Sequence, residues 1–113
     1  MKKFLFVLTI SIFSPHVLAG GGSGKISLLF VHANSNGDGI ILFSTSSNSN
    51  KAACSLADGK RGWAFKVDSP LGQAMYSLLL TAITMNREIL IIGTGNCENW
   101  SDREKPLYIR LKD

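Results

Sequence analysis

The chain is poor in the residue types on which most enzymes rely for covalent or redox chemistry. It has two cysteines and two histidines among its 113 residues. Cys54 and Cys97 lie too far apart in the sequence for a redox pair of the Cys-x-x-Cys kind. His32 is the one histidine after residue 19, and we expect it to pack within a strand or face solvent rather than act as a general base. The sequence therefore predicts no enzyme, and no catalytic site, metal site or cofactor.

Two glycine-containing motifs that would indicate a bound ligand are incomplete. Residues 93–95 (Gly-Thr-Gly) follow a predicted strand but lack a third glycine and a following helix, which excludes a dinucleotide site. Residues 34–39 resemble the start of a calcium loop, but the first position is the uncharged Asn34 and the twelfth, Thr45, has no carboxylate. A hairpin turn is the better interpretation, because Asn-Gly and Asp-Gly both tolerate positive φ.

Charges of both signs are mixed along the chain, without a run of either sign. The formal net charge of +4 includes Lys2 and Lys3, which precede an apolar N-terminal run. The other lysines and arginines are scattered among aspartates and glutamates, so no basic stripe is available for nucleic acid. We expect no nucleic-acid partner.

One apolar run, residues 4–13, stands out, and it lies at the N-terminus. Two lysines precede it, and residues 17–19 (Val-Leu-Ala) end it with small side chains at the positions that govern signal-peptide cleavage. The run is too short to cross a bilayer of about 30 Å as a stable helix. The pattern predicts a signal peptide over residues 1–19, cleaved near Ala19, and a secreted or periplasmic mature protein without a membrane span.

Export has consequences for the rest of the chain. In an oxidising compartment two cysteines have one intramolecular pairing open to them, so we expect a Cys54–Cys97 disulfide. Residues 20–24 are glycine-rich and predict a flexible leader. Residues 25–113 are enough for a single domain, whose small core would depend strongly on the disulfide.

Periodicity predicts six elements in the order strand, strand, strand, helix, strand, strand. The expected ranges are strands over residues 26–33, 39–45 and 63–67, a helix over 70–85, and strands over 88–93 and 107–111. Ser69 is a predicted helix cap before Pro70, and residues 46–51 are expected to form a polar surface loop. One helix face is apolar and is expected to be buried: Leu71, Met75, Leu78, Ala82 and Met85. This order is that of an OB-fold, a five-stranded Greek-key barrel; an α+β sandwich is the alternative.

Aromatic and amide side chains in loops are the best candidates for a binding site, because rings stack on apolar sugar faces while amides and hydroxyls meet sugar hydroxyls. The candidates are Trp100 with Asn96, Asn99 and Ser101, and the hairpin residues Asn36 and Asp38. Glu98, Asp102 and Glu104 form an acidic group in the same late loop. Solvated surface charge is the favoured interpretation of that group, with a hydrolase site as the alternative.

Several short stretches in the middle of the chain carry a family resemblance. They are Ala53-Cys54-Ser55, Trp63-Ala64-Phe65, Gln73-Ala74-Met75-Tyr76, the strand Ile89 to Ile92, and Cys97. Together they resemble the binding subunit of subtilase cytotoxin and its relatives. The resemblance implies a secreted OB-fold with one disulfide, no catalysis, a pentameric ring and recognition of sialylated host glycans. The alternative is that the chain resembles a group of small exported bacterial proteins with the same fold.

The leading hypothesis is thus a secreted or periplasmic OB-fold binding module that recognises a glycan or a protein partner, either alone or as a homo-oligomer. The alternative is a small structural or inhibitory envelope protein that binds a protein partner.

Overall fold

A computed structural model of the chain describes residues 18–55 and 62–113. The predicted signal peptide therefore lies outside the described residues, apart from Leu18 and Ala19. Within the described part of the chain, the one helix is too short to cross a membrane.

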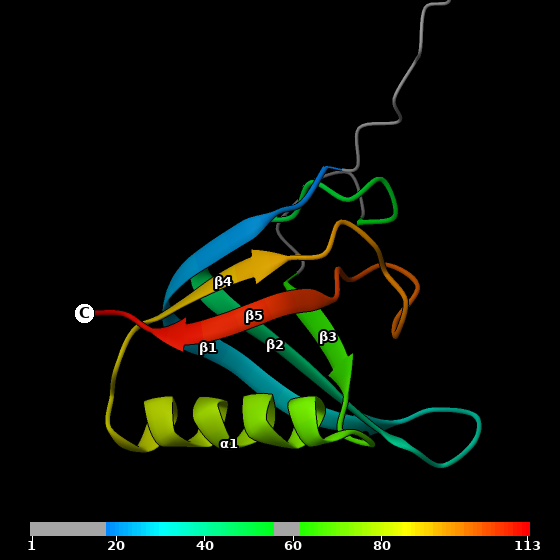
Figure 1. Cartoon of the computed structure of the whole chain (residues 1–113), viewed down its shortest axis with the longest axis horizontal. Helices are drawn as coiled ribbons and strands as arrows, with labels where there is room; N and C mark the ends of the chain where they lie inside the picture. The colour runs from blue at the N-terminus through cyan, green and yellow to red at the C-terminus, as the bar shows by residue number, and fades with distance from the viewer. Residues whose placement is uncertain (1–17, 56–61) are drawn as a thin grey trace, which may run out of the picture.

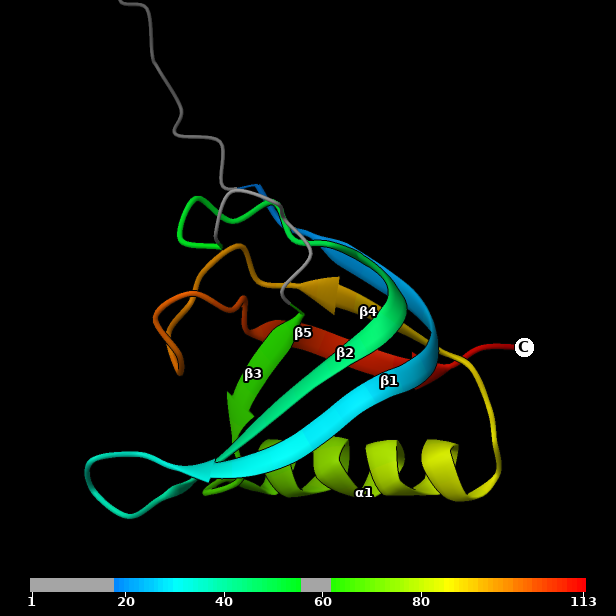
Figure 2. The ribbon, with the colours of Figure 1, turned by 180° about the vertical axis from the view of Figure 1, so that it is seen from behind.

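The predicted order of elements is confirmed, and the strands form one antiparallel sheet. The elements are β1 (Gly21–Ala33), β2 (Gly39–Ser49), β3 (Trp63–Lys66), α1 (Pro70–Thr84), β4 (Ile89–Gly93) and β5 (Pro106–Leu111). The strand order is β3-β2-β1-β4-β5, and the sheet curves over α1, as Figures 1 and 2 show from opposite sides. A single parallel bridge, Trp63 to Glu104, joins β3 to the segment before β5. The sheet is not closed by a ladder there, so the structure shows a curved five-stranded sheet rather than a complete barrel.

β1 begins earlier than expected, at the glycine-rich segment. Gly21–Gly24 pair with β4, from Gly21 opposite Ile92 to Gly24 opposite Ile89. Gly21–Ser23 also pair with residues 47–49 at the end of β2. The predictions of a flexible leader over 20–24 and of a surface loop over 46–51 are therefore wrong for these strand residues. Glycine permits the pairing, because a Cβ on Gly22 would lie 3.1 Å from the Ser47 carbonyl oxygen.

The helix begins and ends where its capping residues predict. The Gly72 amide donates to Ser69 Oγ at 3.0 Å, and Asn86 follows the helix with a left-handed φ of 53°. The buried face is Gly72, Met75, Leu79 and Ala82, so the predicted stripe is wrong for Leu71 and Met85, each 57% exposed. The helix is therefore rotated about its axis relative to the predicted orientation. Gly72 explains this rotation, since a Cβ on Gly72 would lie 2.0 Å from the Lys66 carbonyl oxygen. The helix can approach β3 closely only on this side.

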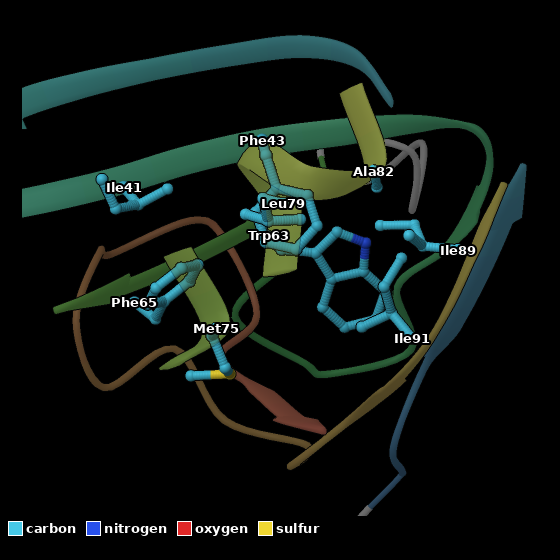
Figure 3. Packing of buried hydrophobic residues seen from close by; sticks show 9 residues of the cluster. All are labelled: Ile41, Phe43, Trp63, Phe65, Met75, Leu79, Ala82, Ile89 and Ile91. Atoms are coloured by element: carbon cyan, nitrogen blue, oxygen red, sulfur yellow. The ribbon is translucent and has the colours of Figure 1, made fainter. Parts of the chain in front are cut away.

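The main core lies between the sheet and α1 and is drawn in Figure 3. Its buried members are Ile41, Phe43, Trp63, Phe65, Met75, Leu79, Ala82, Ile89 and Ile91. The rings of Phe43 and Phe65 meet edge to face, with centroids 5.9 Å apart. A second, smaller cluster of Ile40, Leu42 and Ala64 lies on the opposite face of β2 and β3. Since alternate residues of a strand point to opposite faces, β2 is buried on both sides.

The predicted Cys54–Cys97 disulfide is present, with Cα atoms 6.0 Å apart. It connects the segment after β2 to the long loop between β4 and β5. That loop is thereby fixed to the segment that follows β2.

Candidate functional site

Side chains of three strands share the face of the sheet that turns away from α1. In the β1–β2 ladder Phe30 is opposite Leu42, and His32 is opposite Ile40. In the β2–β3 ladder Leu42 is opposite Ala64. Residues directly opposite each other in an antiparallel pair project to the same side. The face therefore presents Phe30 and His32 next to the second apolar cluster, and we call it the outer face.

The loop over residues 94–105 brings Trp100 onto the outer face. Its base is closed by two backbone hydrogen bonds, from the Thr94 amide to the Lys105 carbonyl at 2.9 Å and from the Lys105 amide to the Asn96 carbonyl at 2.8 Å. The disulfide at Cys97 holds its first half. Trp100 packs against Ile40, Leu42 and Ala64 and is half-buried. The indole is therefore held by the sheet while part of its surface faces solvent.

Three rings gather where this loop meets β1, and we call Phe30, His32 and Trp100 the aromatic platform. The His32 and Trp100 ring centroids are 5.0 Å apart, with an interplanar angle of 69°. The Arg103 guanidinium lies 6.0 Å from the centroid of the Phe30 ring, within the range of a cation–π contact. Phe30 is 37% exposed and His32 is exposed. The platform thus combines apolar ring surface with a cation at its edge.

The tautomer of the neutral His32 ring follows from its own hydrogen bond. Nδ1 is bonded to the carbonyl oxygen of Ala33. A carbonyl oxygen can only accept, so Nδ1 carries the proton. In the neutral ring Nε2 is then an acceptor, suited to a ligand hydroxyl group.

The candidate residues from the late loop divide between two places. Trp100 belongs to the aromatic platform, and Ser101 is exposed beside it in sequence. Asn96 shapes the loop, because its Oδ1 accepts from the Glu98 amide at 3.2 Å. Asn99 lines a different hollow of about 260 Å³ against the start of α1, together with Ser69 and Lys105.

The two hairpin candidates, Asn36 and Asp38, shape the turn between β1 and β2. The Asn34 side-chain oxygen accepts from the backbone amides of both, each at 2.9 Å. This is the hairpin turn that the sequence predicts. The turn extends beyond the rest of the sheet in Figures 1 and 2. These bonds place Asn36 and Asp38 in the turn, whereas Trp100 packs on the outer face of the sheet.

The acidic group of the late loop is dispersed in the structure. Glu98 pairs with Lys105 at 3.2 Å at the surface. Glu104 is fully buried, so the interpretation as solvated surface charge is wrong for this residue. Within residues 18–55 and 62–113, no three acidic, histidine or cysteine side chains are arranged to hold a metal ion.

Sequence reasoning missed Phe30, His32 and Arg103 as parts of a site. A signal was present, because Leu28, Phe30 and His32 alternate along one predicted strand and must share a face. The hairpin register then places this face next to Ile40 and Leu42. Comparisons with protein-family models, with curated proteins and with solved structures found no match for this chain.

Proposed function

We propose that the chain is an exported, non-catalytic binding module with an OB-fold-like barrel, and that its aromatic platform binds a glycan. The observation that carries the proposal is the edge-to-face pair of Trp100 and His32 on the outer face, with Arg103 at the edge of the platform. OB-folds bind oligosaccharides on the face of their second and third strands, between the β1–β2 and β4–β5 loops. Trp100 packs on that face of β2 and β3. The disulfide supports an oxidising compartment.

The surroundings of the platform match the chemistry of a sugar. Ring faces of Trp100 and Phe30 suit the apolar C–H face of a pyranose. Further along β2, a hollow of about 510 Å³ is lined almost entirely by hydroxyl and amide residues, Ser27 and residues 44–48. The positive charge of Arg103 at the edge of the platform favours an anionic ligand. An acidic, sialylated glycan is therefore the ligand class that we favour.

Truncation of the platform is expected to remove glycan binding. We predict that His32→Ala and Trp100→Ala each weaken binding of a sialylated oligosaccharide at least about tenfold, equivalent to about 1.4 kcal/mol. Trp100→Ala removes a stacking surface, and His32→Ala removes a hydrogen-bond acceptor and the ring that packs against Trp100. Isothermal titration with the strongest ligand from a glycan array measures the change. Tyr108→Ala is the matched control, since Tyr108 is an aromatic residue of β5 with 44% exposure. Equal affinity in all three variants, or an array without any bound glycan, would contradict the platform.

A protein partner is the second candidate, favoured by an apolar flank of α1. Leu71, Ala74 and Leu78 line a hollow of about 250 Å³ with Tyr108 and Ile109 of β5. Leu71 is 57% exposed, so its side chain is accessible to a partner. Such a flank suits an envelope protein or further copies of this chain, as in the pentamer implied by the family resemblance.

A charged side chain introduced on this flank is expected to abolish association with a protein partner or with further copies of the chain. We predict that Leu71→Glu converts any oligomer to monomer and removes any stoichiometric partner recovered from periplasmic extract, while the glycan affinity per site stays unchanged. Analytical ultracentrifugation and affinity capture measure the two effects. Gln73→Glu, an exposed change on the same helix turn, is the control. A native chain that is strictly monomeric and captures no protein would refute this second function.

A further inference from the structure

Glu104 carries a buried carboxylate that no side chain of the described residues neutralises. Its exposed fraction is 0%. Oε2 accepts backbone amides from Gly20 at 2.9 Å and from Gly95 at 3.0 Å, and Oε1 has no hydrogen-bond partner. A buried carboxylate is costly unless a cation and a full set of hydrogen bonds compensate it. The half-satisfied group therefore needs a physical explanation.

Gly20, the first donor to this carboxylate, is enclosed by the fold. Its carbonyl oxygen accepts from the Gly93 amide at 2.9 Å. A Cβ on Gly20 would lie 2.4 Å from the Ser49 carbonyl oxygen and 2.7 Å from Glu104 Oε1. Only glycine fits at this position, and Oε1 lies directly beside it.

The chain becomes exposed immediately before Gly20. Leu18 is 60% exposed, and Ala19 is also exposed. The boundary between enclosed and exposed chain thus coincides with the peptide bond at which the sequence predicts signal-peptide cleavage. This coincidence is independent of the platform and of its ligand.

We propose that Gly20 is the N-terminal residue of the mature protein and that the Glu104 carboxylate is the binding site for its α-ammonium group. A signal peptidase hydrolyses the bond between the Ala19 carbonyl carbon and the Gly20 nitrogen. The hydroxyl of the water joins the carbonyl carbon, and its proton goes to the Gly20 nitrogen. The free amine takes a second proton from solvent, since α-amino groups have pKa values of about 7.7–8.0.

Hydrolysis replaces one N–H at Gly20 with three and adds a positive charge. One N–H keeps the existing bond to Oε2, and the others become available to Oε1. The cation also compensates the buried charge, and charge-assisted bonds are about twice as strong as neutral ones. Cleavage must precede folding, because Gly20 is buried in the folded chain. The ion pair then fixes the start of β1 to the β4–β5 loop only in the processed chain.

The first test is made on the protein purified after export. Intact mass and N-terminal sequencing are expected to show a start at Gly20. Acylation of the α-amine near neutral pH is expected to be slower than in the unfolded chain by about 100-fold, because the group is buried and paired. Glu104→Gln should remove most of this protection. Glu98→Gln, an exposed acid of the same loop that pairs with Lys105, is the matched control and should not.

The main comparison of the second test does not need the Glu104 variant to fold. A chain that retains Ala19 keeps the native carboxylate but moves the ammonium away from it. Its thermal midpoint is expected to be lower by about 5 °C or more, and the loss should shrink when Glu104→Gln is present in both chains. A start at another residue, an α-amine as reactive as in the unfolded chain, or equal midpoints with and without Ala19 would overturn the proposal.

Discussion

Replacement of both Cys54 and Cys97 by alanine is expected to lower the free energy of unfolding by about 4 kcal/mol, a large share of the stability of a small domain. The disulfide closes a loop with a sequence separation of 43 residues. Without it the unfolded chain has more conformational entropy, which favours unfolding. The disulfide also holds the loop of Trp100. Chemical denaturation followed by circular dichroism measures the change, and glycan affinity should fall with it.

Ser55→Ala provides the matched control for this experiment. Ser55 is adjacent to Cys54, and its buried Oγ has no hydrogen-bond partner. Its removal should change stability by less than about 0.5 kcal/mol. If the double cysteine variant unfolded at the same denaturant concentration as this control, the disulfide would have no stabilising role.

Trp63→Ala is expected to cost about 3–5 kcal/mol, because it leaves a large cavity in the main core. Trp63 is 0% exposed, and Figure 3 shows its ring next to Ile91. Its Nε1 donates to Asn48 Oδ1 at 3.2 Å, so the substitution also leaves a polar acceptor without this donor. Urea denaturation monitored by far-UV circular dichroism measures the loss.

Trp100→Ala is the comparison variant for Trp63→Ala, because it tests whether Trp100 contributes to the core or to the binding surface. Trp100 covers only the small cluster of Ile40, Leu42 and Ala64, so we expect a cost of about 1–2 kcal/mol. Quenching of fluorescence by iodide should affect Trp100 and spare Trp63, and a bound glycan should protect Trp100. If the two alanine variants were equally destabilised, the late loop would be part of the core and the aromatic platform would lose its role as a binding surface.

The order of the elements could be predicted from the sequence because each depends on local chemistry. The Asn34 turn, the Ser69 cap with Pro70, and the left-handed Asn86 are formed by side chains or backbone within a few residues. The β1–β2 hairpin follows from the same kind of signal. Pairing of Gly21–Gly24 with β4 could not be predicted, because backbone hydrogen bonds between strands leave no mark in the composition of a glycine segment.

The candidate site was predictable only in part. Trp100 was identified by its residue type and its loop, whereas His32 and Arg103 gained a role only through their neighbours. His32 and Trp100 are distant in the sequence and meet because the loop over 94–105 places Trp100 against the outer face. Asn36 and Asp38 have suitable chemistry but remain in a separate turn.

The sequence by itself determined the hairpin, the capped helix and the identity of the disulfide partners, since these depend on short-range chemistry or on there being only two cysteines. Tertiary structure alone decided which face of α1 is buried, because the close approach of Gly72 to Lys66 sets its rotation. It also decided that Glu104 is buried beside Gly20 while Glu98 stays at the surface. Long-range packing determines burial, and burial changes the same carboxylate from a solvated charge into a group that requires a partner.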